Sequence, residues 1–511
     1  MFDATPLLRR YAGRRLGALS RHDPIVEQRR VLERLVARAR FTQFGRDHRF
    51  EAIRTVADYQ QQVPLRRYED FWRDYWQSAF PVLRDVTWPG LIPFFALSSG
   101  TTSGTTKYIP CSAAMNRSNT RAGADLLAYH LQARPDSRVL GGLSFMLGGS
   151  TDLTTLADGV QAGDLSGIAV RVMPWWARRR YFPPESLALL SDWERKVALL
   201  AERSRGLDIR MIGGTPSWLL IYFDRLASGR KDARLVDYFP NLELLVHGGV
   251  NFAPYRGLFE RWLAGSQALL REVYPASEGF VAAADRGPGE GLRLFVDNGL
   301  FFEFVPIDEL DSPQPSRHWL GTIETGVEYA VVITTCAGLW SYLVGDTVRF
   351  VEQRPPRLLV TGRTAYMLSA FGEHLTDAEI ESAMAAAADQ EQLAVVDFTV
   401  GPVFPDGPGD LGGHLYMVEF ADEPDGERLA RFAAALDAAL MRSNDDYRAH
   451  RADGFGLRGP RVQALAPGAF AAWMKAQGRL GGQNKVPRVL VDPDRFKALR
   501  AGLASFVRGQ S

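Results

Sequence analysis

Residues 98–110 combine small hydroxyl residues, glycines and one lysine, a composition that can bind phosphate. The residues of this loop that could contact phosphate are Ser98, Ser99, Gly100, Thr101, Thr102 and Lys107. Glycines and hydroxyls let backbone N–H groups approach phosphate oxygens closely, and a lysine adds a positive charge. An apolar run over residues 91–97 precedes the loop and predicts a buried strand. The spacing does not fit the Walker pattern, so a flexible surface loop remains the alternative.

The composition is that of an ordinary globular protein, with 46% hydrophobic and 23% charged residues. A length of 511 residues favours two domains over one. The formal net charge of +1 gives no electrostatic reason to expect a nucleic acid or an acidic membrane as a partner. The sequence has no apolar run long enough to span a membrane, and we expect none.

The cysteine content also limits the possible classes of protein. Cys111 and Cys336 are too few for a disulfide framework or a metal cluster, and both have apolar neighbours. We therefore expect two small core residues and a location in the reducing cytoplasm. The arginines between residues 9 and 15 fit an amphipathic helix better than a transit peptide. Nothing in the sequence demands a second subunit, and we expect a monomer.

Predicted strands and helices that must position the loop alternate along the sequence. Residues 1–80 are expected to be mostly helical, and from residue 91 apolar runs alternate with helix-like segments. This alternation predicts βαβ units and a largely parallel sheet, in which ligands bind beyond the carboxyl ends of the strands. The predicted strands are Val139–Leu147, Ile168–Met173, Ile209–Gly213, Leu242–His247 and Leu269–Tyr274, and the predicted helices include Glu185–Ser204 and Pro254–Ala264.

In residues 292–361, short β-like runs alternate with turns, which predicts a smaller antiparallel β unit. Its expected strands are Leu292–Val296, Leu300–Val305, Gly321–Glu324, Tyr329–Thr335, Thr347–Val351 and Leu358–Val360. A second α+β section follows, with strands at Val395–Val400 and Leu415–Phe420 and a long helix at Glu427–Arg451. We therefore predict an α/β fold with a large domain over residues 1–361, a hinge over 362–375 and a small mobile domain over 376–511.

Two further motifs follow predicted strands. Tyr274 and, three and four residues later, Ser277 and Glu278 offer an aromatic ring for a nucleobase and a carboxylate for Mg²⁺. Asp346 follows Gly345 at the end of another apolar run, where a carboxylate can accept hydrogen bonds from ribose hydroxyls. A plain strand exit and a turn-forming Gly-Asp pair are the respective alternatives.

Two more clusters lie near the domain junction and the C-terminus. Gly362-Arg363 could form a hinge, or could belong to any linker. Lys485 stands between a glycine-rich turn and Pro487, an arrangement that could deliver its ammonium group into a distant active site. The alternative for Lys485 is a single exposed lysine.

The order and spacing of these motifs resemble the adenylate-forming superfamily, and most closely its GH3 branch of acyl acid amido synthetases. The loop matches the GH3 pattern Ser-Ser-Gly-Thr-x-x-Gly-x-x-Lys-x-x-Pro at every named position. The Tyr-x-x-Ser-Glu, Tyr-x-x-Gly-Asp and Gln-x-Lys-x-Pro-Arg elements follow in the same order. A further signature, Asn444-x-x-Tyr447 with Arg451, also matches and is expected to be structural. The resemblance spans roughly residues 90 to 490.

The resemblance implies a role for each matched residue. Ser98, Ser99, Gly100, Thr101, Thr102 and Lys107 would cradle the phosphates of ATP. Gly248, Gly249 and Tyr274 would flank the adenine, with Ser277 nearby. Glu278 would hold Mg²⁺, Asp346 would bind the ribose, and Arg363 would serve the hinge or contact the nucleotide. Lys485 would reach over from the small domain, so that Lys485, Lys107 and Glu278 are the implied catalytic residues.

The implied reaction is ATP-dependent activation of a small carboxylic acid as acyl-AMP, followed by transfer of the acyl group to an amino acid. An acid–thiol ligase that uses coenzyme A or a carrier protein is the alternative, and a binding protein on a decayed scaffold is another. His247 stands where plant members carry a small residue, and the hinge residues Gly362–His374 differ from the plant sequence. The identity of the substrates therefore does not carry over from the plant members. Candidates for the acyl pocket, each of which could equally be a core residue, are Met146, Trp175, Trp218 and Tyr222.

Overall fold

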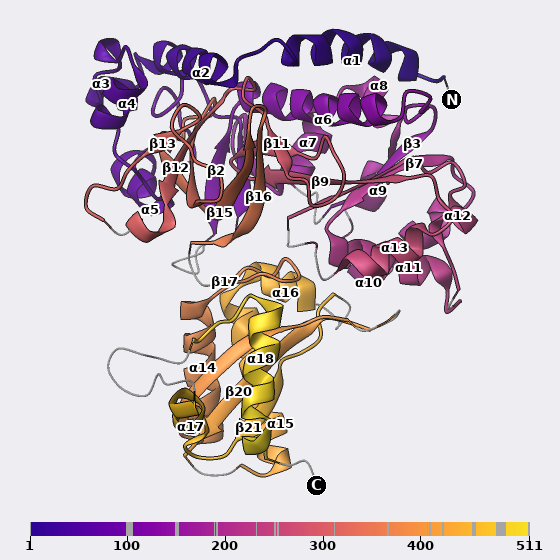
Figure 1. The fold of residues 1–511 in the computed structure, drawn as a ribbon, viewed down its shortest axis with the longest axis vertical. Coiled ribbons are helices and arrows are strands. Elements are labelled where there is room, and N and C mark those ends of the chain that lie inside the picture. Colours follow the sequence, from indigo (N-terminus) through magenta and orange to yellow (C-terminus); the bar gives the residue numbers. More distant parts are fainter. Residues whose placement is uncertain are drawn as a thin grey trace.

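The protein consists of a large N-terminal domain and a smaller C-terminal domain (Figure 1). The computed structural model describes residues 2–98, 106–148, 153–188, 190, 193–230, 232–249, 252, 255–310, 312–364, 367–405, 407, 410–421, 424–451, 456–476 and 487–508. The predicted α/β class is confirmed. The exact limits of the two domains and of the hinge stay predictions.

The first part of the chain is helical, as expected. Its helices are α1 (Thr5–Leu19), α2 (Pro24–Ala39), α3 (Gln43–Asp47), α4 (Val56–Gln62) and α5 (Tyr68–Phe71). Helix α2 begins at Asp23, whose carboxylate accepts from the backbone N–H groups of Ile25 and Val26, and Pro24 occupies its first turn. Its apolar residues at helical spacing, such as Val31 and Leu35, are buried in the core.

The main sheet of the large domain contains twelve described strands. They are β3 (Leu143–Leu147), β6 (Tyr181–Phe182), β7 (Ile209–Gly214), β8 (Leu244–Gly248), β9 (Leu269–Ala276), β10 (Gly279–Ala283), β11 (Leu292–Leu294), β12 (Leu300–Pro306), β13 (His318–Trp319), β14 (Glu328–Thr335), β15 (Tyr342–Gln353) and β16 (Pro356–Arg363). Their spatial order is β13-β12-β14-β15-β16-β11-β10-β9-β8-β7-β3-β6. Strands β6, β3, β7, β8 and β9 pair in parallel, and the others pair antiparallel. The antiparallel strands expected after residue 292 thus continue the parallel sheet instead of forming a separate one.

A second, four-stranded sheet carries the start of the predicted phosphate loop. It consists of β1 (Phe94–Ser98), β2 (Lys107–Cys111), β4 (Thr154–Ala157) and β5 (Val160–Gly163), in the order β2-β1-β5-β4. The strand predicted before the loop is therefore present, and β1 and β2 form an antiparallel pair across it.

Two of the predicted strands are wrong. The run Ile168–Met173 lies mostly in a helix, α7 (Leu165–Val172), in which Gly167 and Ile168 are buried and Val172 is exposed. The β-branched residues of this run favour a strand locally, but packing of the chain as a helix against β1 and β5 decides the outcome. The run Gly321–Glu324 is a turn that follows β13.

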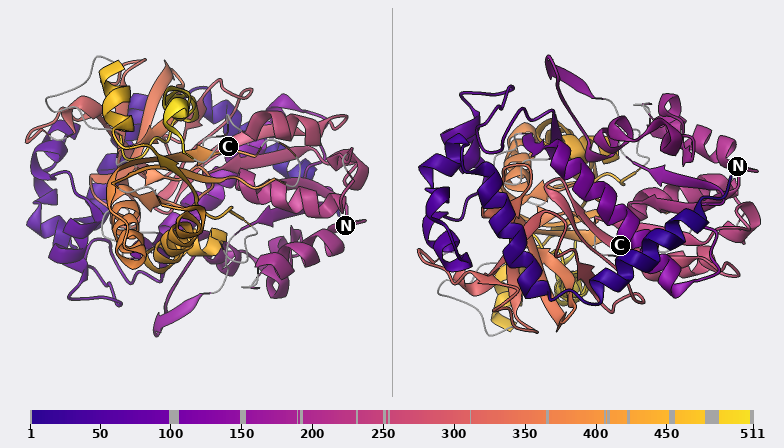
Figure 2. Two further views of the ribbon diagram at one scale, coloured as in Figure 1. Left: turned by 90° about the horizontal axis from the view of Figure 1, so that it is seen from below. Right: turned by 90° about the horizontal axis from the view of Figure 1, so that it is seen from above.

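Helices cover both faces of the parallel strands. On one face, α1 and α6 (Ala113–Ala133) pack on alternate residues such as Leu244 and Val246 of β8. The other face is covered by α10 (Trp193–Ser204), α11 (Pro216–Ala227) and α13 (Arg256–Leu263), which pack near Leu245. Figure 2 shows α1 and α2 crossing the side of the large domain that is opposite the small domain. Shorter helices are α8 (Trp175–Arg178), α9 (Glu185–Ala188) and α12 (Leu235–Tyr238).

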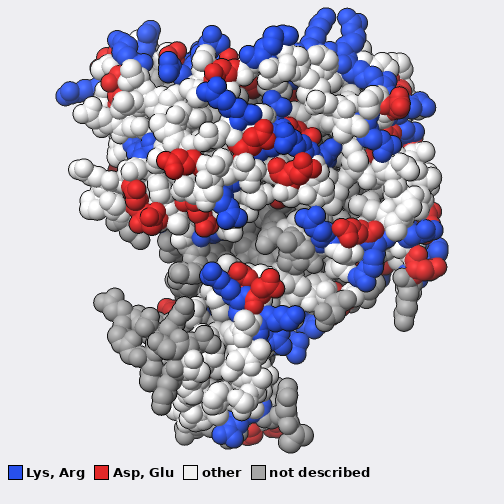
Figure 3. Space-filling model, viewed as in Figure 1, with Lys and Arg blue, Asp and Glu red and all other residues white. Residues whose placement is uncertain are grey.

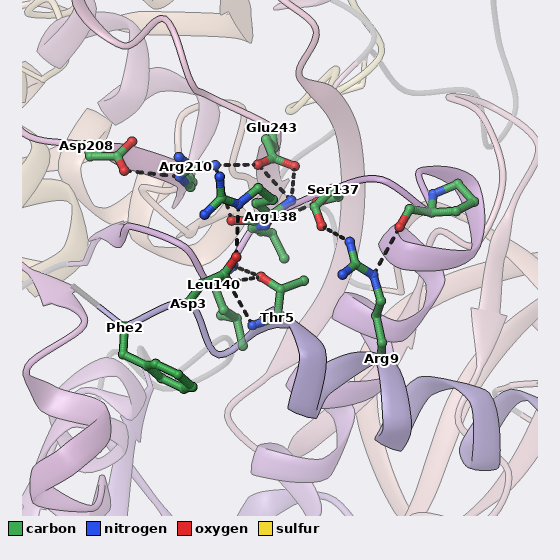
Figure 4. A network of polar contacts seen from close by, with 12 residues as sticks. Phe2, Asp3, Thr5, Arg9, Ser137, Arg138, Leu140, Asp208, Arg210 and Glu243 are labelled. Atoms are coloured by element: carbon green, nitrogen blue, oxygen red, sulfur yellow. Dashed lines mark hydrogen bonds and ion pairs between the residues drawn. The ribbon is translucent and has the colours of Figure 1, made fainter.

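Charged side chains attach the N-terminal segment to the amino ends of the parallel strands (Figure 4). The Asp3 carboxylate accepts hydrogen bonds from the backbone and hydroxyl of Thr5 and from Nε of Arg138. Glu243, just before β8, accepts from the backbone N–H of Arg138 and from Arg210 of β7. These contacts lie at the opposite ends of the strands from the glycine-rich turns, and so leave the carboxyl ends for ligands.

The small domain packs helices on a three-stranded sheet. Its elements are β17 (Met367–Leu368), β18 (Leu375–Thr376), α14 (Asp377–Glu391), β19 (Val395–Val403), β20 (Gly413–Phe420), α15 (Gly426–Ser443), α16 (Asp445–Arg451), β21 (Arg461–Leu465), α17 (Ala469–Ala476) and α18 (Pro493–Leu503). Strands β17 and β18 form a separate antiparallel pair, and the larger sheet has the order β19-β20-β21.

The long helix predicted over Glu427–Arg451 is split into α15 and α16. Asn444 is extended between them, with its side-chain oxygen accepting from the backbone N–H of Tyr447. Its amide group donates to the backbone oxygen of His374 and to Glu379. Tyr447 and Arg451 both contact Asp437, so this signature joins elements within the small domain.

The two domains touch through aromatic residues. The Tyr255 hydroxyl donates to the backbone oxygen of Ala370 at 2.7 Å. The Trp218 ring of α11 lies 5.2 Å from the His450 ring of α16, measured between centroids. None of the described helices combines the length and the apolar character needed to cross a membrane.

Candidate active site

Strand pairing fixes the two ends of the predicted phosphate loop. Ser98, the last residue of β1, lies opposite Lys107, the first residue of β2, in the antiparallel register. Ser99, Gly100, Thr101 and Thr102 lie outside the described residues. The hairpin therefore places the base of the loop, and its only lysine, at one edge of the four-stranded sheet.

Lys107 is a buried cation, with only 8% of its surface exposed. Its Nζ atom lies 3.9 Å from Glu69 of α5 and 5.5 Å from the centre of the Tyr68 ring. Burial lowers the pKa of Lys107, and the charges of Glu69 and Glu278 only partly oppose this effect. An anionic ligand placed here would relieve that cost, as a phosphate group would.

Asp346 sits between Tyr274 and Arg363. The Tyr274 hydroxyl of β9 donates to Asp346 Oδ2 at 2.5 Å, and Arg363 Nε lies 3.2 Å from Oδ1. Asp346 on β15 and Arg363 on β16 are direct partners in the sheet register. Burial and the Asp346 charge together raise the pKa of Tyr274 well above its usual value, so its hydroxyl stays protonated and donates. The carboxylate is thereby held in a fixed orientation, with further lone pairs for a ligand.

Glu278 lies in the turn between β9 and β10, directly after Ser277, and is 8% exposed. Burial is the largest cause that raises its pKa, and the Asp346 charge adds to it, whereas Lys107 and Arg363 act in the opposite direction. The Glu278 carboxylate is therefore electrostatically coupled to three other predicted site residues. Lys107, Asp346 and Arg363 therefore lie near enough to Glu278 for their charges to act on it, although two different sheets supply these residues.

Gly248 and Gly249 end the neighbouring strand β8. A side chain at Gly248 would meet the backbone oxygen of Val273 at 2.3 Å, and Gly249 has a φ of +88°, so both positions require glycine. His247 is buried and stacks on Phe252 with ring centres 3.7 Å apart, which is the environment of a core histidine. Burial lowers its pKa to about 3, so the ring is neutral.

A magnesium ion would find limited protein coordination at this site. The described residues contain no group of three His, Cys, Asp or Glu side chains placed to hold a metal ion. Glu278 supplies one carboxylate, while Asp346 is already engaged by Tyr274 and Arg363. This fits Mg²⁺, which commonly binds through one or two carboxylates together with substrate phosphates and water.

Lys485 also lies outside the described residues. The residues just after it contact the small domain, since the Thr399 hydroxyl donates to the backbone oxygen of Pro487 and Arg488 pairs with Asp397 and Glu381. The structure thus brings together Lys107, Tyr274, Glu278, Asp346 and Arg363, and leaves the contribution of Lys485 as a prediction.

The candidates for the acyl pocket separate into two kinds. Tyr222 is fully buried, hydrogen-bonded to Ser204 at 2.7 Å and packed on Phe145, so the core alternative holds for Tyr222. Met146 is 41% exposed and lies against Gly213, at the carboxyl ends of β3 and β7. Trp175 is 70% exposed, and Trp218 lies at the domain boundary. Met146 and Trp218 remain accessible to a ligand.

Sequence reasoning missed several charged residues near this edge. Glu69 precedes Lys107 by almost forty residues in the sequence and becomes its neighbour only through packing of α5. Lys196 of α10 is buried and donates to the backbone oxygens of Gly148 and Ala188, at the end of β3 and of α9. Asp164 begins α7 and has a pKa raised to about 6, first by burial and then by the Asp446 charge. Most basic residues of this chain are arginines, so the rarity of lysine was the one sequence feature that could have singled out Lys196.

The site as a whole has one buried cation, Lys107, one partly exposed cation, Arg363, and two buried carboxylates at the ends of strands from two sheets. On the face of the large domain seen in Figure 3, acidic and basic side chains are interspersed. Local arrangement, rather than overall charge, therefore distinguishes the site. It can bind an anion at Lys107, hold hydroxyl groups at Asp346 and support a divalent cation at Glu278.

Comparison with known families identifies the chain. Residues 19–201 match the GH3 family N-terminal domain, residues 293–363 match the GH3 family central domain, and residues 378–494 match the GH3 family C-terminal domain. Together these matches cover well over half of the chain. They include Lys107, Asp346 and Arg363.

Individual relatives agree with this family. The chain is 34% identical over 190 residues to a jasmonoyl-L-amino acid synthetase (JAR4) of Nicotiana attenuata, covering 35% of this chain and 32% of that protein. It is 26% identical over 264 residues to a probable indole-3-acetic acid-amido synthetase (GH3.9) of Oryza sativa subsp. japonica, covering 48% of this chain and 59% of that protein. The matched part thus spans less than two thirds of these relatives.

Solved structures extend the likeness to the whole fold. The GH3.15 acyl acid amido synthetase superposes with a TM-score of 0.58 at 18% identity, covering 97% of this chain and 96% of that one. A 2-hydroxyisobutyryl-CoA ligase in complex with its acyl-AMP and CoA gives a TM-score of 0.57 at 18% identity, covering 93% and 91% of the two chains. The chain therefore has the fold of these two structures, and the family matches show that it belongs to the GH3 family.

Proposed function

We propose that the protein is an ATP-dependent ligase that adenylates a small carboxylic acid and transfers the acyl group to the amine of an amino acid. The observation that carries this proposal is the coupled site of Lys107, Glu278, Asp346 and Arg363 beside the predicted phosphate loop. Membership of the GH3 family supports it, because the relatives named above are acid–amino acid synthetases.

In the first half-reaction, a carboxylate oxygen of the substrate attacks the α-phosphate of ATP and displaces pyrophosphate. The protein has to align the two anions and neutralise the charge that develops between them. We assign phosphate binding to Ser98, Lys107 and the loop residues Ser99, Gly100, Thr101 and Thr102. Lys107 suits this role because its ammonium group is already desolvated and would gain a counter-charge from the phosphate.

The other residues hold the nucleoside. We assign the ribose hydroxyls to Asp346, which Tyr274 and Arg363 orient. The adenine would lie by Gly248, Gly249 and the backbone near Tyr274 and Ser277, where glycine leaves space for a ring. Glu278 would hold Mg²⁺, which supplies positive charge to the phosphates when bound.

We assign Lys485 to stabilisation of the charge on the carboxylate and the α-phosphate during adenylation. Arg363 ends β16 at the junction between the domains, and Thr364 bonds back to Gly345 at 2.8 Å, which supports a hinge just after these residues. Rotation of the small domain about residues 362–375 would move Lys485 away from the active site. It would bring another face of that domain to the site for the second half-reaction.

We also propose that the protein works as a monomer in the reducing cytoplasm, with no nucleic acid or membrane as a partner. Cys111 and Cys336 are buried and unpaired, and burial raises the pKa of each thiol to about 12. Both thiols would therefore stay protonated and unreactive in that compartment.

The test is release of pyrophosphate from MgATP across a panel of aryl and alkyl carboxylic acids, with no acceptor, with amino acids, or with coenzyme A. We expect one acid to support turnover that amino acids accelerate, with the amide identified by mass spectrometry. Acceleration by coenzyme A alone would replace the proposal by an acid–thiol ligase. Binding of ATP without pyrophosphate release for any acid would contradict the adenylation itself.

A further inference from the structure

A histidine of the predicted hinge and an aspartate of the small domain form a hydrogen-bonded pair at the boundary with the large domain. His374 Nδ1 lies 3.0 Å from Asp446 Oδ2. His374 directly precedes β18, and Asp446 lies in α16. Figure 1 shows β17 and α16 on the side of the small domain that faces the large domain. The contacts of Ala370 with Tyr255 and of His450 with Trp218 come from these same two segments.

The pairing determines which nitrogen of His374 can act as a base. In a neutral imidazole, a hydrogen bond from Nδ1–H to a carboxylate leaves the lone pair on Nε2. Among the described residues, nothing hydrogen-bonds to that Nε2 atom. The side chain keeps 27% of its surface exposed, so a small molecule in the boundary region can reach it.

The backbone also holds His374 in an uncommon conformation. Its φ angle is +46°, in the left-handed region that residues other than glycine rarely adopt. The amide group of Asn444 donates to its backbone oxygen at 3.1 Å and helps to keep it there. Strained residues of this kind occur preferentially at functional sites, because the surrounding contacts must maintain them.

Across the boundary, the large domain presents a carboxylate. Asp164 begins α7, directly after β5, and β5 runs parallel to β1 with Gly163 opposite Ala96. Asp164 and Ser98 therefore leave the same edge of the sheet. Burial and the nearby Asp446 charge raise the pKa of Asp164 to about 6, and the charge of Lys196 opposes this only in part, so the negative charge of Asp164 is electrostatically costly. An ammonium group between Asp164 and Asp446 would relieve that cost.

We propose that His374, oriented by Asp446, is the general base that removes a proton from the acceptor amine in the second half-reaction, and that Asp164 attracts this amine as an ammonium ion. This assignment rests on the proposed function, since it needs an acyl-AMP and an amine. His374 is the catalytic residue, and Asp446 is a positioning residue that fixes its tautomer.

The proton balance requires such a base. An amino acid arrives mainly as R–NH₃⁺, which has no lone pair for attack. His374 Nε2 takes one proton, the freed lone pair forms the C–N bond to the acyl carbon, and the C–O bond to AMP breaks with its electron pair on the AMP phosphate. The nitrogen then loses a second proton to water, as His374 also returns its proton to water, leaving the neutral amide and AMP.

The decisive variant is His374→Asn. Asparagine tolerates a positive φ and can still donate a hydrogen bond to Asp446, but it lacks Nε2. We expect amide formation from an amino acid to fall by about 10²- to 10⁴-fold, the contribution usual for a general base. Adenylation, measured as exchange of labelled pyrophosphate into ATP, should stay unchanged because it precedes the step. His318→Asn, at a partly exposed histidine of β13 that contacts a backbone oxygen, is the matched control.

Hydroxylamine separates a chemical role from a structural one. It is already unprotonated at neutral pH and needs no base, so His374→Asn should form the hydroxamate at the wild-type rate. Asp446→Asn should show the same pattern more weakly, with a lower kcat for the amino acid and an unchanged rate with hydroxylamine. Equal loss of hydroxamate and amide formation would overturn the proposal, because it would indicate a damaged site.

The design keeps two failures apart. If wild-type protein performs pyrophosphate exchange and forms the amide, and His374→Asn does both at full rate, only the assignment of the base is wrong. If wild-type protein shows exchange but no amide with any amino acid, the proposed function fails, and the assignment fails with it.

Discussion

Two clusters of buried charge in the large domain have opposite electrostatic characters. One joins α1 to the body of the domain, where Arg15 donates to Asp125 at 2.6 Å and to Asp297 at 2.6 Å, with Tyr11 and Arg121 completing the network. The other is the candidate active site, where Lys107 Nζ lies 3.9 Å from Glu69. Both clusters are removed from water, so burial alone does not distinguish them.

The direction of the pKa shifts distinguishes them. Burial by itself would lower the pKa of Arg15 and raise that of Asp297, but the hydrogen bonds between them reverse both effects. At the candidate site burial wins, so the pKa of Lys107 is lowered and that of Glu278 is raised. The first cluster satisfies its charges internally and serves stability. The second keeps charges that a ligand could satisfy, as expected of a binding site.

The largest effect is expected from breaking the satisfied cluster. Arg15→Met should lower the free energy of unfolding by about 3–5 kcal/mol, because two buried carboxylates lose their main partner. The measurement is denaturant unfolding, with Arg14→Met, at an exposed neighbour on the same helix, as the control. The activity of the folded fraction should not change. A loss below 1 kcal/mol would contradict the structural role.

The opposite pattern is expected at Lys107. Lys107→Met should reduce pyrophosphate release by about 10²- to 10³-fold, as for loss of one preorganised charge contact. It should leave stability unchanged or raise it, since an apolar side chain of similar length avoids the desolvation cost of the buried cation. Lys497→Met, at an exposed lysine of α18, is the control. If Lys107→Met lost stability but kept its activity, Lys107 would serve stability, and its assignment to the ligand site would be wrong.

Tyr274→Phe tests the orientation of Asp346. Removal of a hydrogen bond to a charged group should cost about 1.5–3 kcal/mol, which corresponds to roughly a ten- to hundredfold higher KM for ATP. The matched control is Tyr222→Phe, which removes a buried hydroxyl bound to Ser204 in the core. That control should lower stability slightly and leave the KM for ATP unchanged. Equal KM values for ATP in Tyr274→Phe and Tyr222→Phe would show that the orientation of Asp346 by Tyr274 does not contribute to nucleotide binding.

The smallest effect concerns His247, a buried histidine without a counter-charge. Its pKa is about 3 in the folded protein and 6.5 in the unfolded chain, so only the unfolded chain binds this proton between those values. Stability is therefore complete above pH 6.5 and falls by at most about 1.4 kcal/mol per pH unit as the pH drops toward 3.

His247→Phe should remove this part of the slope and retain stacking on Phe252. The free energy of unfolding, measured at intervals between pH 7 and pH 4, checks the prediction. His130, with a pKa lowered to about 4, keeps part of the acid sensitivity in the variant. An unchanged slope would mean that His247 is protonated in the folded protein.

Much of the fold was predictable from local patterns. Strands β7, β8, β9 and β14 are close to their predicted ranges, because long apolar runs between turn residues favour strands. The run at Ile168 was misassigned, since its β-branched residues favour a strand while its packing requires a helix. The sequence analysis also predicted a separate antiparallel unit after residue 292, whereas β11 pairs with β10 and so continues the main sheet. Hydrogen bonding between two strands leaves no local pattern in the sequence.

The candidate site shows the same division. The motifs predicted one site for Lys107, Tyr274, Glu278, Asp346 and Arg363, and the structure places these residues in or next to strands β2, β9, β15 and β16, while their roles stay predictions. They did not reveal Glu69, which α5 brings to Lys107. They also did not reveal the pairing of His374 with Asp446, residues separated by 72 positions.

The sequence by itself determined the order of the motifs, the alternation of elements and the GH3 resemblance, since each depends on residue types at short spacing. Only the tertiary structure decided which charges are satisfied and which are not. Strand register places Arg363 beside Asp346, and packing of α5 places Glu69 3.9 Å from Lys107, farther than Asp125 lies from Arg15. Such contacts depend on distances of a few ångströms between distant segments, which local spacing does not fix.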